Sequence, residues 1–287
     1  MLHPHRVLTG SILFCVSLLF ASCTQQSTSG TTSDATEENA DSTSSVLIHK
    51  DIPVSQPFYQ ITNLSSIDIE VVNGPCHVEA IGDSLLISSL SFECDGGGLT
   101  VTMLSTAIPG LNKFKAKSSQ THLVISCPEL RILANCGNGN IYSHEPLHTT
   151  QLHVGGMSAG RIQIDTLYCH SLKWEQGQQT EGAFGFVKCN DAMFLCYGTS
   201  TTSVDSLCCD SLFTCDLSNG SALNAHVSSP VITSLASGQS KATLHSVSNE
   251  FSLSAAEQSE IELTGKCRQP NIKFGSKAKV VNRMTSL

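Results

Sequence analysis

The chain has 287 residues and a formal net charge of −8, from 16 Lys and Arg against 24 Asp and Glu. A mildly acidic protein binds nucleic acid poorly, and its average charge argues against electrostatic docking onto anionic lipid. Charged residues make up only 14% of the chain, and Ser, Thr, Gly and Asn take their place. This composition favours β-structure with many turns and disfavours helical bundles.

Residues 1–22 have the three parts of a secretory signal peptide. A polar start carries Arg6, an apolar run covers residues 11–20, and two small residues stand directly before Cys23. The apolar run is too short for a permanent transmembrane helix, which needs about 20 residues. A Cys in this position resembles the bacterial lipobox, which implies diacylation of Cys23 and stable attachment to a membrane. An ordinary signal peptide followed by an incidental Cys is the alternative.

Residues 23–46 contain the lipidated Cys23 and the segment that links it to the folded body. From Thr24 to Ser45 this segment has no bulky apolar residue, so it has nothing to bury in a core. We expect a flexible, Ser/Thr-rich tether here and a folded domain over residues 47–287. Thr24 is not the Asp that retains many bacterial lipoproteins at the inner membrane, so the expected location is the outer membrane.

Between residues 47 and 128, apolar and polar residues alternate. The inward positions include Ile67, Ile69, Val71, Val78, Ala80, Leu99, Val101, Met103, Leu123 and Ile125. Turn signals separate these runs at Gly74-Pro75, Gly82-Asp83 and residues 95–98. The pattern predicts strands joined by turns, with no helix.

From about residue 129 the chain repeats itself every 20 residues or so. One column of the repeat holds Leu152, Leu172, Ala192, Leu212 and Ile232. A second column holds Leu167, Val187, Leu207, Val227 and Val247, and a third holds Ile164, Phe184, Val204, Asn224 and Leu244. Asn224 is the one residue that does not suit an apolar position. Small and polar residues fill the stretches between the columns.

A repeat of this length, with two-residue alternation inside it, is typical of a β-solenoid. The predicted fold class is therefore all-β, a single-stranded parallel β-helix with about 20 residues per coil. Equivalent side chains of successive coils would stack about 4.8 Å apart and together exclude water. An antiparallel sandwich of evenly spaced strands is the alternative fold, because strands of 8–12 residues would halve this period.

Residues from about Phe58 to Leu263 resemble the head GIN domain family, the putative auto-transporter adhesins. The similar segments are GPCHVEAIGDSLLI with DGGGLTV, then VISCPELRILANCGNGNIYS, and then the coil repeats. The resemblance implies a parallel β-helix in an exported lipoprotein of the Bacteroidetes type and no established enzymatic activity. This chain departs from the family pattern in its high Cys content.

Eleven cysteines remain after Cys15 in the signal peptide and Cys23 are set aside. Cys169, Cys189 and Cys209 are spaced by 20 residues and follow an apolar column by two positions, so we expect them to stack as a ladder that points inward. Cys208 and Cys215 have the opposite parity and are expected at the surface. Disulfide pairing, for example of Cys76 with Cys94, is left open.

The sequence predicts no catalytic residue, no metal site and no cofactor. His144, His148, His153 and His170 fall within 27 residues of each other, but their loose spacing is typical of surface and turn residues. No nucleophile elbow, zinc-protease motif, phosphate loop or dinucleotide fingerprint occurs. The acids of the repeats form no column across consecutive coils, which argues against a polysaccharide-cleaving β-helix enzyme.

These observations predict a non-enzymatic lipoprotein of the cell envelope that acts in adhesion, binding or scaffolding. Its expected partners are a membrane, through the lipid on Cys23, and a glycan or protein ligand; nucleic acid is not expected. A carbohydrate-active β-helix enzyme and a purely structural envelope spacer are the alternatives.

Overall fold

The computed structural model describes residues 47–104 and 120–287, which belong to one compact unit that begins at Ser44. The predicted signal peptide (1–22), Cys23 and the tether (23–46) lie outside the described residues. No helix within the two described ranges is long and apolar enough to cross a membrane.

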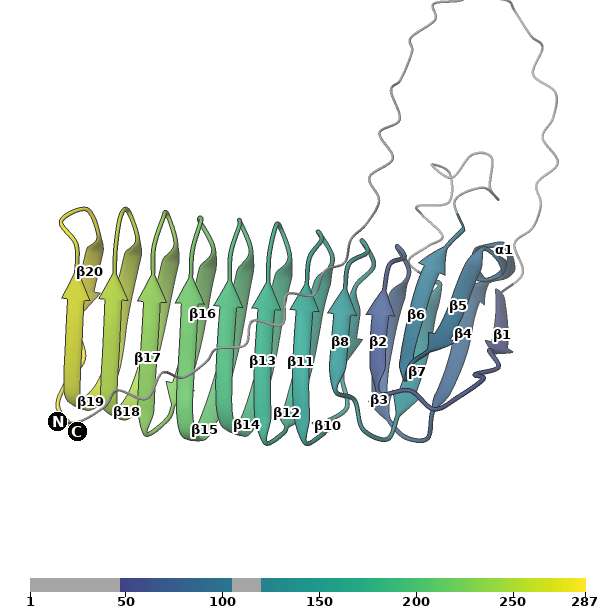
Figure 1. Cartoon of the computed structure of the whole chain (residues 1–287), viewed down its shortest axis with the longest axis horizontal. Helices are drawn as coiled ribbons and strands as arrows, with labels where there is room; N and C mark the ends of the chain where they lie inside the picture. Colours follow the sequence, from purple (N-terminus) through teal and green to yellow (C-terminus); the bar gives the residue numbers. More distant parts are fainter. Residues whose placement is uncertain (1–46, 105–119) are drawn as a thin grey trace, which may run out of the picture. The chain divides into compact units, whose positions relative to one another are not determined.

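The first part of the unit is an irregular, mixed-topology start to the stack of coils (Figure 1). Its elements are β1 (Leu47–Asp51), β2 (Gln60–Asn63), β3 (Asp68–Asn73), β4 (His77–Asp83), α1 (Ser84–Ser88), β5 (Leu90–Asp95), β6 (Gly98–Met103) and β7 (His122–Cys127). Strand β4 runs antiparallel to both β1 and β7, and β5 and β6 form an antiparallel hairpin. The strands predicted here are confirmed, whereas the prediction of no helix misses α1, which the Asp83 side chain caps by accepting bonds from Leu85 and Leu86 N–H.

The remaining elements are parallel strands stacked coil upon coil (Figure 1). They are β8 (Ile132–Asn135), β9 (Ile141–Ser143), β10 (Leu147–His148), β11 (Gln151–Gly156), β12 (Arg161–Tyr168), β13 (Ser171–Gln176), β14 (Glu181–Cys196), β15 (Thr201–Leu217), β16 (Ala222–Ser228), β17 (Val231–Ala236), β18 (Lys241–Ala255), β19 (Glu260–Phe274) and β20 (Lys279–Asn282). Their pairing is parallel throughout, and the coils are close to 20 residues long. The predicted β-solenoid is therefore confirmed.

The solenoid has two long faces. The first face runs through β5, β6, β2, β8, β11, β13, the second half of β14 and of β15, β17, and the second half of β18 and of β19. The second face runs through β1, β4, β7, β3, β9, β12, the first half of β14 and of β15, β16, the first half of β18 and of β19, and β20. Apolar side chains from both faces meet in the narrow space between them.

The columns follow the predicted 20-residue spacing except where a coil is one residue longer or shorter. A register shift between Cys189 and Asp191 places Phe213, not Leu212, beside Ala192, so that Leu212 lies outside and the prediction for it is wrong. A side chain displaced by one position points to the opposite face of a strand, which is why a single extra residue has this effect.

The same reason corrects two further positions. Val204 pairs with Ala225, so Ala225 occupies the apolar column and Asn224 points outward, which explains its misfit. The next coil is correspondingly short and pairs Val227 with Ser246, which leaves Val247 exposed. Ile164, Phe184, Val204 and Leu244, and Leu167, Val187, Leu207 and Val227, are buried as predicted.

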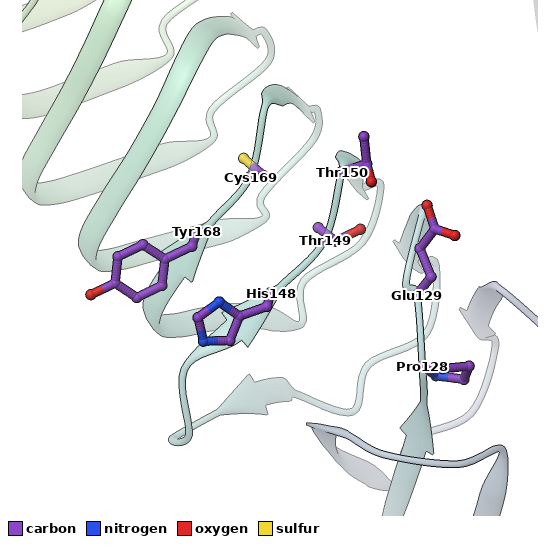
Figure 2. Close-up of a pocket in the computed structure, with 7 residues that line it drawn as sticks. All are labelled: Pro128, Glu129, His148, Thr149, Thr150, Tyr168 and Cys169. Atoms are coloured by element: carbon purple, nitrogen blue, oxygen red, sulfur yellow. The ribbon is translucent and has the colours of Figure 1, made fainter.

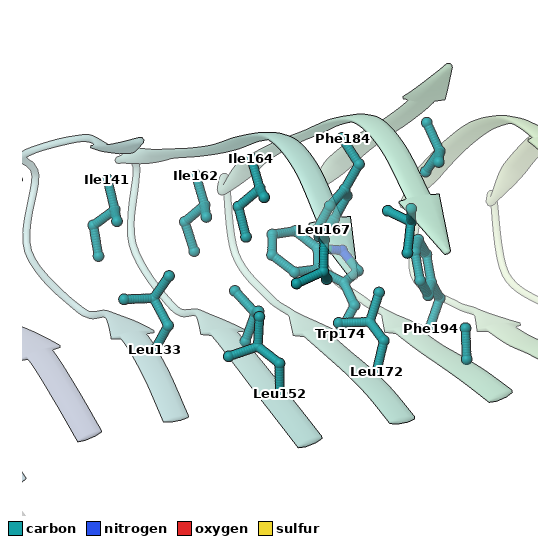
Figure 3. Close-up of a cluster of buried hydrophobic side chains, with 14 of the residues drawn as sticks. Leu133, Ile141, Leu152, Ile162, Ile164, Leu167, Leu172, Trp174, Phe184 and Phe194 are labelled. Atoms are coloured by element: carbon teal, nitrogen blue, oxygen red, sulfur yellow. The ribbon is translucent and has the colours of Figure 1, made fainter. Parts of the chain in front are cut away.

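The centre of the core is a chain of aromatic side chains in the middle of the solenoid (Figure 3). Trp174 and Phe184 meet edge to face at 5.0 Å, and Phe194 continues the contact at 5.9 Å from Phe184. Phe213 follows at 5.4 Å from Phe194. Edge-to-face contacts of this kind stabilise a core beyond the area that they bury.

A column of fully buried hydroxyl residues stabilises one row of turns. Its members are Thr180, Ser200, Ser221, Ser240 and Ser259. Most of these hydroxyls donate to a backbone carbonyl of a nearby turn, as Ser200 does to Tyr197 and Ser259 does to Ala256. The buried hydroxyls and the turn carbonyls thereby satisfy each other.

We expect Thr180→Val to lower the free energy of unfolding by about 1–3 kcal/mol, because Val has the same shape but leaves buried polar groups unpaired. The Thr180 hydroxyl lies 2.7 and 2.9 Å from the Ser158 and Gly177 carbonyl oxygens, to either of which it can donate its one hydrogen, and it accepts from Ser158 N–H at 3.2 Å. Urea denaturation followed by circular dichroism measures the change. The exposed Thr201→Val is the matched control, and an equal loss in both variants would contradict the assigned role.

Candidate functional site

The candidate site is a shallow hollow along one row of turns (Figure 2). Its volume is about 570 Å³, and it is lined by Pro128, Glu129, His148, Thr149, Thr150, Tyr168 and Cys169. Pro128 and Glu129 belong to the turn after β7, whereas Thr149 and Thr150 form the turn between β10 and β11. The Thr149 hydroxyl donates to the Leu130 carbonyl at 2.6 Å and so holds the two turns together.

An exposed aromatic pair forms one wall of the hollow. His148 pairs with Tyr168 in the parallel register of β10 and β12, and the two rings stack with centroids 4.9 Å apart and planes 6° apart. Phe186 extends the group, with its ring centroid 5.9 Å from that of Tyr168. Tyr168 nevertheless remains 41% exposed. A flat, amphipathic ring that is fixed by stacking and still open to solvent offers a ready contact surface for a ligand.

A charged pair lies at the opposite side of the hollow. Arg131 donates to the Glu129 carboxylate at 3.1 Å, and this hydrogen bond is the main reason that the pKa of Glu129 is lowered. The Arg131 guanidinium also lies over the Tyr59 ring, 5.3 Å from its centroid. Glu129 is therefore an anionic acceptor at neutral pH, although an exposed pair of this kind contributes little to stability.

Cys169 connects the hollow to the predicted cysteine ladder. Cys189 and Cys209 are buried as predicted, with their Sγ atoms 3.5 Å apart, whereas Cys169 is only half-buried. A hydrogen bond to Cys189, together with burial, raises the pKa of Cys169, so that its thiol stays protonated at neutral pH. The ladder is a packing feature that ends at the wall of the hollow.

The other cysteines give one correction. Cys215 is fully buried beside Phe194, not exposed as predicted, because of the same register shift that displaces Leu212. Burial raises the pKa of Cys127 and of Cys215 to about 12, which makes both thiols unreactive at neutral pH. Cys76 and Cys94 are free thiols, as are the other nine cysteines of the two described ranges.

The four histidines considered from the sequence do not converge. His144 pairs with Asp165 at 2.9 Å, His153 with Glu175 at 3.3 Å, and His148 stacks on Tyr168. Burial away from solvent is the main reason that the pKa of His153 is lowered, and the positive charge of the nearby Lys173 lowers it further. In the part of the chain that the structure describes, no three His, Cys, Asp or Glu side chains are grouped to hold a metal ion.

Sequence reasoning did not select Tyr168 or Phe186, and it took His148 as a surface or turn residue without a metal or catalytic role. A usable signal does exist, because His148 and Tyr168 are one coil apart at outward positions and are both aromatic. Cys23, the single predicted site residue, lies outside the residues that can be described.

The fold and the hollow define a class of protein: a parallel β-solenoid with an open hollow on its surface. Residues 57–181 match the family model described as "Putative auto-transporter adhesin, head GIN domain". The resemblance predicted from the sequence is thereby confirmed, and the matched range includes every residue that lines the hollow. Comparison with curated proteins gives no match.

Solved structures share the fold. A putative adhesin from Parabacteroides distasonis is 13% identical, with a TM-score of 0.65 over 83% of this chain and 98% of its own. A putative adhesin from Parabacteroides merdae is 14% identical, with a TM-score of 0.60 over 83% and 96%. A putative lipid binding protein from P. distasonis is 13% identical, with a TM-score of 0.58 over 84% and 96%. At these identities the likeness concerns the fold alone.

Proposed function

We propose that the protein is a non-enzymatic adhesin of the cell envelope that binds its ligand at the hollow around Tyr168. The observation that carries this proposal is the stacked His148–Tyr168 pair, which keeps an aromatic face open to solvent. The adhesin names of the matched family and of two solved neighbours support the same class of function. None of these names denotes an enzyme.

A cell-surface glycan is the ligand that fits this hollow best. The Tyr168 ring can stack against the apolar face of a sugar, while Thr149, Thr150 and Glu129 offer hydroxyl and carboxylate partners to sugar hydroxyls. Pockets for small molecules usually enclose most of the ligand surface. An open hollow instead suits a few sugar residues of a longer glycan that continues beyond the site.

We expect Tyr168→Ala to weaken glycan binding at least tenfold, since it removes the stacking face and leaves the solenoid core intact. A glycan array identifies the ligand, and calorimetry measures the affinity of the wild type and the variant. Tyr197→Ala is the matched control, because Tyr197 is a half-exposed tyrosine in the other row of turns. Equal binding by the two variants would rule out the hollow as the glycan site.

We further propose that the protein is lipidated at Cys23 and resides in the outer membrane. The lipobox-like sequence before Cys23 supports this assignment. Protease treatment of intact cells should cut the folded body if it faces outward, and cleavage that occurs only after lysis would argue against adhesion. Cys23→Ser should release the protein from the membrane fraction in a high-salt wash, because it removes the acylated side chain.

A further inference from the structure

Although the chain has a net charge of −8, one end of the solenoid is strongly basic. Residues 264–287 contain six Lys and Arg and no Asp or Glu. They form the second part of β19, the strand β20 and the residues around them, at the end of the stack opposite β1 (Figure 1). The average charge of the chain is thus a poor guide to what this end attracts.

Four of these six cations have no anionic partner among the described residues. Lys279 pairs with Glu260 at 2.8 Å, and Arg283 pairs with Glu262 at 2.5 Å. The remaining four, here called the basic end, are all exposed: Lys266, Arg268, Lys273 and Lys277. Four exposed, unpaired cations at one end of the solenoid produce a local positive potential. Lys279 and Arg283 contribute less to this potential, because a Glu neutralises each of them.

Apolar side chains are exposed at the same end. Phe274 occupies the column of Ala236 and Ala255, both of which are buried, yet it is 60% exposed, since none of the described strands pairs with it on the side away from Ala255. Val281 and Leu287 are also exposed, at 46% and 52%. The last coil therefore presents an aromatic ring and aliphatic groups among its cations.

The open strand edges here do not favour pairing with a second copy of the chain. The Gln269–Phe274 part of β19 and the strand β20 each have one sheet partner, and both are edge strands. Pro270 lacks an N–H donor, and Lys273 and Lys279 place charge on these edges. Proline and lysine are the residues that natural proteins use to block edge-to-edge association.

We propose that the basic end docks onto the surface of an anionic phospholipid bilayer. Its four cations would contact headgroup phosphates, and Phe274 would insert at the boundary between headgroups and acyl chains. Each Lys or Arg near an anionic membrane surface strengthens such binding. This function is separate from ligand binding at the hollow.

The acidic remainder of the chain does not cancel this attraction. The Debye length is about 8 Å at physiological ionic strength, and successive coils are about 4.8 Å apart. Acids more than two coils from the end are therefore largely screened. In the preceding coil, Glu260 and Glu262 are already paired with cations, which leaves Glu250 and Glu257 as two acids against the four cations of the basic end.

Vesicle sedimentation tests the proposal with residues 24–287, which contain the whole described core but lack Cys23. We expect binding to phosphatidylcholine vesicles that contain phosphatidylglycerol, little binding to phosphatidylcholine alone, and loss of binding at high salt. Replacing all four residues of the basic end by Gln should weaken binding at least tenfold. Phe274→Ser should also weaken it, with no change in charge.

The matched control replaces four other exposed or half-exposed cations by Gln and should bind as the wild type does: Lys50, Arg161, Lys173 and Lys188. Thermal unfolding checks that all variants are folded. Equal weakening in the two quadruple variants would overturn the proposal, since net charge alone would then explain binding. Absence of vesicle binding by the wild type would also overturn the proposal. If the wild type instead self-associates in a concentration-dependent manner, and the quadruple variant of the basic end does not, the partner of this end is a second copy of the chain.

Discussion

Replacing Trp174 by alanine is expected to lower the free energy of unfolding by about 3–5 kcal/mol, which is a large fraction of the stability of an ordinary domain. Trp174 is fully buried and packs edge to face on Phe184. Its indole Nε1–H donates to the Thr202 hydroxyl at 3.0 Å, and that hydroxyl in turn donates to Gln176. The truncation therefore creates a cavity and also leaves a buried hydroxyl short of one partner.

Urea denaturation followed by far-UV circular dichroism measures this loss, because Trp174 is the only tryptophan and its fluorescence disappears with it. Leu235→Ala is the control, since Leu235 is exposed on the first face and its truncation should cost less than about 1 kcal/mol. Trp174→Phe should fall between the two, because it keeps most of the volume but loses the hydrogen bond. A loss in Trp174→Ala no larger than in Leu235→Ala would contradict the stacked core.

Gly139→Ala is expected to cost at least about 2 kcal/mol, by a different mechanism. A Cβ atom at Gly139 would lie 2.6 Å from the carbonyl carbon of Ile67, so the backbone of one of the two coils would have to move. Asn135 holds the same turn by donating to the Gly139 carbonyl at 2.8 Å. The glycine-rich segment of the family resemblance thus has a structural role, which is close approach between stacked coils.

Gly155→Ala provides a closely matched control. A Cβ atom there would meet no atom within 4 Å, so this change should be nearly neutral. The two variants can be compared by thermal unfolding and by the yield of soluble protein. Equal stability of the two would show that the turn at Gly139 tolerates a side chain and would contradict the close packing on Ile67.

The repeat was predictable because its cause is local. Alternation within a strand sets which side chains point inward, and the length of a coil sets which of them stack. Leu167, Val187 and Leu207 therefore lie in one buried column, as expected from their spacing. The candidate site was not predicted in the same way, because Tyr168 occupies an outward position, where the packing of the core imposes no pattern and the only signal is the aromatic His148 one coil earlier.

The sequence by itself determined the class of fold, the approximate coil length and the identity of most core columns, because these follow from periodicity alone. Only the tertiary structure decided the order of the first coils, in which β2 lies between β6 and β8 although it precedes both in the chain. It also decided where a coil gains or loses one residue, which exposes Leu212 and buries Cys215. These features depend on which distant strands pair. The free energy of that pairing is spread over the whole stack, so no single segment of the sequence indicates the partner of a strand.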